Sequence, residues 1–131
     1  RDKSFDSIGK NMSEVKIGKN FRVVAPQGIA QIVSPAENVN GLTIRTASSN
    51  PRNGFVNLYA SETAPLVAAA GNANRLIFNA NGNTLDGSSS SVFMPYPLFI
   101  PAGLGLWVTS GPLSGTTPTV GGIALTWDFV A

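Results

Sequence analysis

The chain has 131 residues, of which 43% are hydrophobic and 12% are charged, and it contains neither cysteine nor histidine. This length suits one domain with its own core. The missing residue types exclude zinc fingers, Cys–His proteases, Ser–His–Asp hydrolases, and haem or iron–sulfur centres bound by those side chains. The charged fraction lies well below the roughly 25% of a typical soluble domain, which favours a protein that assembles with others. We therefore expect no cofactor.

The positive charge is concentrated at the N-terminus of the chain. The formal net charge is +2. Residues 1–22 hold six basic and three acidic side chains, whereas residues 23–131 hold three basic and four acidic ones. We predict a basic N-terminal arm over residues 1–20 and a folded domain over residues 21–131. The candidate docking residues of this arm are Lys3, Lys10, Lys16, Lys19 and Arg22.

The composition of the arm indicates a contact with protein. Its basic residues are diluted by acidic ones and form no Lys/Arg cluster, so we do not expect specific nucleic-acid recognition. A contact with an acidic protein surface fits the same charges. Two similar pentapeptides, 7–11 and 16–20, are either a repeated docking element or two turns that are alike by chance. No apolar run reaches about 18 residues, so no membrane partner is expected.

The rest of the chain has the pattern of an all-β protein. Runs of Val, Ile, Thr and aromatic residues are separated by clusters of Gly, Pro, Asn and Ser, which is typical of short strands. In 41–47, alternation places Leu42, Ile44 and Thr46 on one face. The period-two signal is strongest in 122–130. The predicted strands are 21–25, 28–33, 41–47, 55–60, 65–69, 75–79, 91–94, 97–100, 104–109 and 122–130.

Turn residues agree with this assignment. Asn-Gly pairs at 40–41, 53–54 and 81–82 are typical of tight turns between strands. The nine prolines bracket the predicted strands instead of interrupting them. The alanine-rich segment 65–69 is either a strand or a turn. Short strands at this spacing predict a single antiparallel β-sandwich that is jelly-roll-like and carries an extended N-terminal arm.

The titratable residues of the domain give no catalytic or metal-binding pattern. Its carboxylates are Glu37, Glu62, Asp86 and Asp128, and their wide spacing gives no acid–base pair. We expect no enzymatic activity; the alternative is a hydrolase in which the fold brings two of them together. Segment 79–87 places oxygen donors at alternate positions, but only Asp86 is charged and the closing Glu of a calcium loop is missing. A hairpin tip is the better interpretation.

Aromatic residues are concentrated in the last third of the sequence. Trp127 and Phe129 alternate in phase with the apolar residues of their strand, which predicts that both face the core. Tyr96 lies between two prolines and is the candidate exposed aromatic of a binding surface. The polar loops 87–91 and 110–119 are either contact surfaces or solvent-exposed connections.

Two segments resemble parts of a known class of protein. Residues 97–108 read Pro-Leu-Phe-Ile-Pro-Ala-Gly-Leu-Gly-Leu-Trp-Val. This segment is similar to the closing hairpin of small jelly-roll domains in virion proteins of tailed bacteriophages. Residues 123–130 are similar to the last strand of such domains. Cupins share Pro-Ala-Gly turns of this kind, but the metal-dependent members need histidine ligands that this chain lacks.

The resemblance implies a structural virion protein that decorates the capsid or attaches a fibre or baseplate. It implies a location on the phage particle surface, a capsid or other virion protein as partner, and a homo-oligomer, with a trimer favoured. The arm suits docking or strand addition to a neighbour's sheet edge. We expect a capsid decoration (cementing) protein. The alternative is a receptor- or carbohydrate-binding tail tip, which predicts exposed aromatic residues beside Asn or Asp side chains on one rim.

Overall fold

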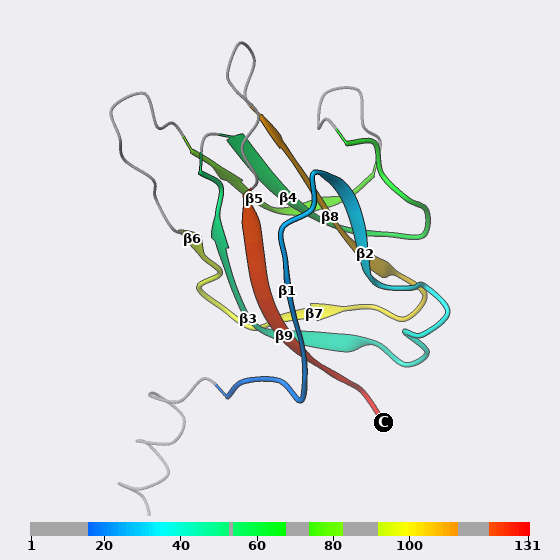
Figure 1. Cartoon of the computed structure of the whole chain (residues 1–131). Helices are drawn as coiled ribbons and strands as arrows, with labels where there is room; N and C mark the ends of the chain where they lie inside the picture. The colour runs from blue at the N-terminus through cyan, green and yellow to red at the C-terminus, as the bar shows by residue number, and fades with distance from the viewer. Residues whose placement is uncertain (1–15, 53, 68–73, 83–91, 113–120) are drawn as a thin grey trace, which may run out of the picture.

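The computed structural model describes residues 16–52, 54–67, 74–82, 92–112 and 121–131. Within these ranges the chain forms nine β-strands and no helix (Figure 1). None of the described segments has the helical length and apolar character that a membrane crossing needs. The strands are β1 (Asn20–Val24), β2 (Gly28–Val33), β3 (Leu42–Asn50), β4 (Gly54–Ser61), β5 (Leu76–Asn81), β6 (Val92–Phe93), β7 (Leu98–Ile100), β8 (Gly105–Pro112) and β9 (Gly122–Phe129).

The strands form two antiparallel sheets that pack face to face (Figure 1). One sheet has the order β1-β9-β3-β6, with β7 also paired to β3, and the other has the order β2-β8-β4-β5. The pairing is nested, because β1 pairs with β9, β2 with β8, β3 with β6 and β7, and β4 with β5. This nesting is the jelly-roll arrangement. The predicted antiparallel, jelly-roll-like β-sandwich is confirmed.

The core lies between the two sheets and is built by alternation along each strand. In β9, Ile123, Leu125 and Trp127 are buried, as the period-two pattern predicts. Phe129 at the end of that strand is 38% exposed, so its predicted place in the core is wrong. Phe129 is the last residue of β9, where the strand leaves the sandwich. The other central core residues are Val33, Leu42, Ile44, Ala47, Val56, Leu58, Ile100, Leu106 and Val108.

A β-bulge in β3 changes which side chains face outward. The β3–β9 register shifts between Ile44 and Thr46, so Arg45 is an extra residue. Beyond it, Ala47 enters the core and Thr46 pairs with Thr126 on the outer face. The prediction that Thr46 shares a face with Ile44 is therefore wrong, because one inserted residue reverses the alternation.

Residues 97–108 form an arch between the two sheets. The predicted closing hairpin is wrong, because β7 pairs with β3 whereas β8 pairs with β2 and β4 of the opposite sheet. Gly103 in this arch has φ 87°, which a residue with a Cβ rarely adopts. The described part of 65–69 contains no strand, so the strand alternative is wrong for 65–67. The predicted loop 110–119 is wrong for 110–112, because β8 continues to Pro112. Residues 1–15, 87–91 and 113–119 lie outside the described residues.

A substitution in the centre of β4 tests the core assignment. Leu58 is fully buried between the sheets, and we expect Leu58→Ala to lower the free energy of unfolding by about 2–5 kcal/mol through lost burial and a residual cavity. Leu66→Ala is the matched control, because Leu66 is 60% exposed and such changes usually stay within about 0.5 kcal/mol. Urea denaturation measures both. Equal losses at the two positions would contradict the assignment.

Candidate functional site

The outer face of the sheet β1-β9-β3-β6 has large side chains at its margins and small ones in its middle. The strand register sets two rows across this face. One row runs Val23, Ala124, Ser48, Phe93, and the next runs Phe21, Thr126, Thr46. The large residues come from β1 and β6, and the small ones come from β9 and β3. The result is a trough whose floor is formed by the two central strands.

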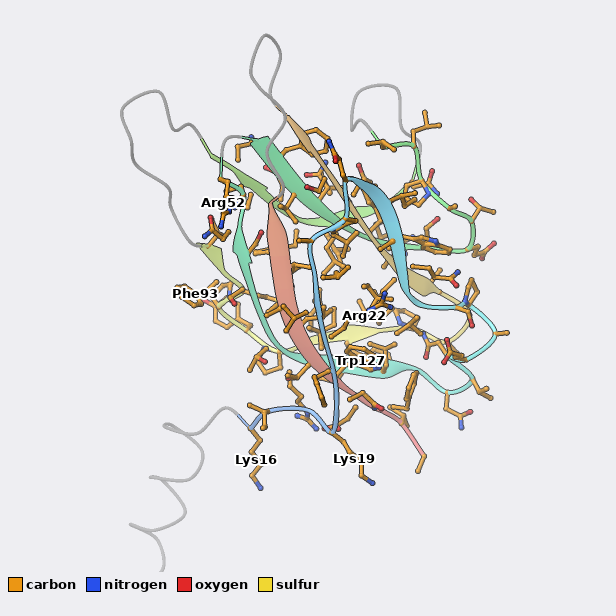
Figure 2. The ribbon with its side chains drawn as sticks, viewed as in Figure 1. Lys16, Lys19, Arg22, Arg52, Phe93 and Trp127 are labelled. Atoms are coloured by element: carbon orange, nitrogen blue, oxygen red, sulfur yellow. The ribbon has the colours of Figure 1, made fainter. Side chains whose placement is uncertain are left out.

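This trough is an apolar groove with a volume of about 700 Å³. Ile17, Phe21 and Val23 line one side. Phe93 and Tyr96, at the opposite margin of the sheet, line the other side, and the label of Phe93 marks this margin in Figure 2. A shallower hollow that shares Val23 and Phe93 continues the groove toward Arg52 (Figure 2). We call the whole feature the outer groove.

The side chains that form the walls are unusually exposed for apolar residues. Ile17 is 75% exposed, Phe21 74%, Val23 78%, Phe93 69% and Tyr96 75%. Single exposed apolar residues are ordinary on a protein surface, but a contiguous group on one face marks an interaction site. The outer groove is therefore the strongest binding feature among the described residues.

The outer face of the opposite sheet is different, because the outward side chains of its central strands β4 and β8 are already covered. Tyr59 pairs with Trp107 and Asn57 with Thr109 across β4 and β8, in alternation with the core residues of those strands. All four are at most 5% exposed. Among the described residues, the contiguous group of exposed large apolar side chains lies on the sheet that contains β1 and β9, whereas Ile29 and Leu76 are exposed at opposite margins of the other sheet.

One end of the outer groove is closed by the chain just before β1. The Gly18 N–H donates a hydrogen bond of 2.8 Å to Thr126 Oγ1, and this hydroxyl lies 2.7 Å from Thr46 Oγ1. A Cβ on Gly18 would lie 2.3 Å from the backbone nitrogen of Trp127. The segment thus crosses β9 so closely that only glycine fits at this position.

A charged group anchors the next residue of the same segment. The Lys19 backbone N–H donates to Asp128 Oδ1 at 2.7 Å, and Arg45 Nε donates to Asp128 Oδ2 at 3.0 Å. These two hydrogen bonds, that of Lys19 first, hold the pKa of the Asp128 carboxyl below its usual value. Asp128 is thus stabilised in its charged form and fixes the entry of the chain into β1.

The candidate arm residues occupy different places. Lys16 and Lys19 are exposed and project from the end of the molecule where the outer groove begins (Figure 2). Arg22 Nη1 donates to the Gln31 carbonyl oxygen at 3.1 Å and so links β1 to β2 across the open edge of the sandwich. Sequence reasoning missed this link. Lys3 and Lys10 lie outside the described residues.

Sequence reasoning pointed to one wall residue, Tyr96, and missed the rest of the outer groove. A usable signal was present in 122–130, where the outward positions Ala124 and Thr126 are small while the inward ones are large. A solvent-facing strand usually carries long polar side chains at such positions. Phe21 and Val23 occupy alternate positions of β1 and so face the same side of the sheet. The sequence around them does not show that they border the same groove as Phe93.

The described carboxylates do not come together. Glu37 Oε1 accepts the Ser34 N–H at 2.9 Å in the turn after β2, and Asp128 pairs with Arg45. Glu62 lines a separate polar hollow of about 590 Å³ beside Arg75, with no second carboxylate among the described residues there. Within the same ranges, no group of three or more Asp and Glu side chains is placed to hold a metal ion. Asp86 lies outside the described residues.

Cations surround the outer groove. Four of the six described basic residues lie beside it or at its ends, whereas of the three described carboxylates only Asp128 is on this face. These basic residues are Lys16, Lys19, Arg45 and Arg52. Comparisons of this chain with protein-family models, with curated proteins and with solved structures find no match.

The close approach at Gly18 can be tested by adding one methyl group. We expect Gly18→Ala to displace the segment from β9 and to lower the free energy of unfolding by about 1–3 kcal/mol, as overpacking does. Lys19→Ala is the control, because Lys19 contacts Asp128 through its backbone. Urea denaturation measures both variants. A Gly18→Ala variant as stable as Lys19→Ala would contradict the described crossing.

The Asp128 anchor predicts a specific dependence on pH. Because its pKa is lowered on folding, Asp128 contributes stability that is present above about pH 4, the usual aspartate value, and is lost as pH falls through the folded-state pKa. We expect Asp128→Asn to be less stable than the native chain at pH 7 and the difference to narrow at pH 3. Exposed Glu62→Gln controls for the change in net charge. A difference that stays constant with pH would exclude this role of the carboxylate.

Proposed function

We propose that this chain is a structural virion protein, a capsid decoration (cementing) protein of a bacteriophage, that assembles through its outer groove. The observation that carries the proposal is the open apolar face of the sheet β1-β9-β3-β6. A sandwich that covers one outer face and leaves the other apolar is built to be covered by another molecule. In this role, the domain bridges neighbouring subunits and adds binding energy that resists outward pressure on the shell.

The energetics of the outer groove support an assembly role. Burial of one large apolar side chain contributes about 1.5–3 kcal/mol, and five such side chains stand exposed in the walls. Their sum is of the size needed to exceed the roughly 4–15 kcal/mol lost in association, although not every contact is fully buried. The low charged fraction of 12% fits a surface that is largely covered.

The resemblance of residues 123–130 to the last strand of phage virion domains supports the virion assignment, and the jelly-roll topology agrees with it. The same resemblance supports a homo-oligomer, with a trimer favoured, and a capsid or other virion protein as partner. The exposed Lys16 and Lys19 at one end of the outer groove suit an acidic surface on that partner.

A receptor- or carbohydrate-binding tip remains the second candidate, because Tyr96 and Phe93 are exposed in one groove. Aromatic rings of this kind stack on the apolar faces of sugars. Among the described residues of the outer groove, Asn50 lines the shallower hollow together with Phe93, and no Asn or Asp lines the part beside Tyr96. A glycan-array signal that disappears in Tyr96→Ala would favour this function over assembly.

The assembly function predicts that one wall residue controls self-association. We expect the native chain to sediment as an oligomer, and Phe93→Ser to weaken association about 10- to 100-fold, since about 1.5–3 kcal/mol of burial is lost. Val39→Ser is the matched control, because Val39 is 71% exposed but lies outside the outer groove. Sedimentation velocity over a concentration series measures all three. A native chain that stays monomeric at high concentration would overturn the proposal.

The virion assignment has its own test. Mass spectrometry and antibody labelling of purified phage particles should locate the native chain on the head surface. Its removal should lower the temperature at which the heads release their DNA. Heads that lack the chain, with the chain found free or in the tail, would exclude capsid decoration.

A further inference from the structure

The outer groove begins where the described chain begins. Ile17 and Gly18 line its closed end, and Lys16 is exposed beside them. Fifteen further residues precede Lys16, and they span about 22 Å as a helix and about 50 Å when extended. The N-terminal segment 1–15 is therefore tethered beside one end of an apolar groove.

The sequence of this segment suits an apolar groove. Its large apolar residues are Phe5, Ile8, Met12 and Val15, and all other positions except Gly9 are polar or charged. The intervals of three, four and three residues place such side chains on one face when a segment is helical. A single apolar stripe with a polar remainder is the pattern of a segment that docks in a groove.

The charges of segment 1–15 are balanced. It carries the acidic residues Asp2, Asp6 and Glu14 and the basic residues Arg1, Lys3 and Lys10. Lys16 and Arg52 stand at the two ends of the outer groove, and Arg45 on its floor is already paired with Asp128. Individual acidic side chains can pair with the cations at the ends, but the net charge gives no attraction, so docking depends on the apolar stripe.

We propose that the outer groove receives residues 1–15 of a second copy of this chain. A return into the groove of its own molecule requires a reversal directly upstream of Lys16. Residues 13–15, Ser-Glu-Val, contain one residue type that favours such a reversal, Ser13, and lack the stronger turn formers Gly, Pro, Asn and Asp. Gly18 and Lys19 are held on β9, so the reversal cannot be taken up there. A neighbour's segment enters without that constraint.

Exchange of this segment gives the assembly a defined geometry. When each copy donates its segment to the next, the contacts close as a reciprocal dimer or as a ring such as a trimer. This inference rests on the proposed function, because both require the outer groove to be the assembly face. It adds that residues 1–15 of a second copy fill this groove.

Disulfide trapping in the full-length chain tests the inference directly, because the native sequence has no cysteine. One variant is Met12→Cys in the segment and the other is Ala124→Cys on the groove floor. Mixed with oxidised glutathione, they should give a heterodimer of twice the chain mass, identified by mass spectrometry of the linked peptides. The control pairs Met12→Cys with Val39→Cys, because Val39 lies outside the outer groove. This pair should give at least tenfold less of the disulfide-linked heterodimer.

Two results would overturn the exchange. The first is a double variant, Met12→Cys with Ala124→Cys, that closes as a monomer with an internal disulfide, which would show that each chain fills its own groove. The second is the absence of any Met12–Ala124 linkage while both variants remain folded and reactive to a thiol reagent, which would show that the segment does not enter the groove.

A second pair of variants separates failure of the exchange from failure of the proposed function. Phe5→Ser with Ile8→Ser removes two of the anchors, and the exchange predicts at least tenfold weaker self-association by sedimentation velocity. If these changes leave the oligomer intact while Phe93→Ser dissociates it, the assembly face stands and the exchange is wrong. A native chain that is monomeric would overturn both.

Discussion

The structure depends on a size difference between the two faces of β9. Its inward residues Ile123, Leu125 and Trp127 are large and fill the core, whereas its outward residues Ala124 and Thr126 are small and form the groove floor. Because β9 pairs with both β1 and β3, this difference spreads across the sheet. The same strand therefore stabilises the sandwich and leaves room for a partner on its outside.

The bulge at Arg45 adapts the neighbouring strand to that arrangement. Without the extra residue, the alternation that buries Ile44 would also point Thr46 inward and Ala47 outward. With it, Thr46 and Ser48 lie outward beside β9, and Arg45 reaches Asp128. A single irregularity thus places Thr46 and Ser48 in the groove floor and supplies the cation that, with the Lys19 N–H, keeps Asp128 charged where the chain enters β1.

The two outer faces of the sandwich have different roles. On the β4–β8 side, Tyr59 and Trp107 are covered within the chain, so that face carries little apolar surface for a partner. On the β1–β9 side, Phe21 and Phe93 remain exposed across a floor of small residues. The cations lie on the same side, and the N-terminal segment is attached there through Gly18. The proposed assembly through this face accounts for these features together.

Local sequence was sufficient for the all-β class, for the approximate positions of most strands and for the exposure of Tyr96, because alternation and turn residues act over a few positions. It also showed that the positive charge belongs to the N-terminal region. The nested pairing, the bulge at Arg45, the Arg22 link to Gln31 and the outer groove were decided only in three dimensions. Each depends on strands far apart in the sequence, and their register is set by long-range pairing. Phe21 and Phe93 become opposite walls only after β9 and β3 have paired between them.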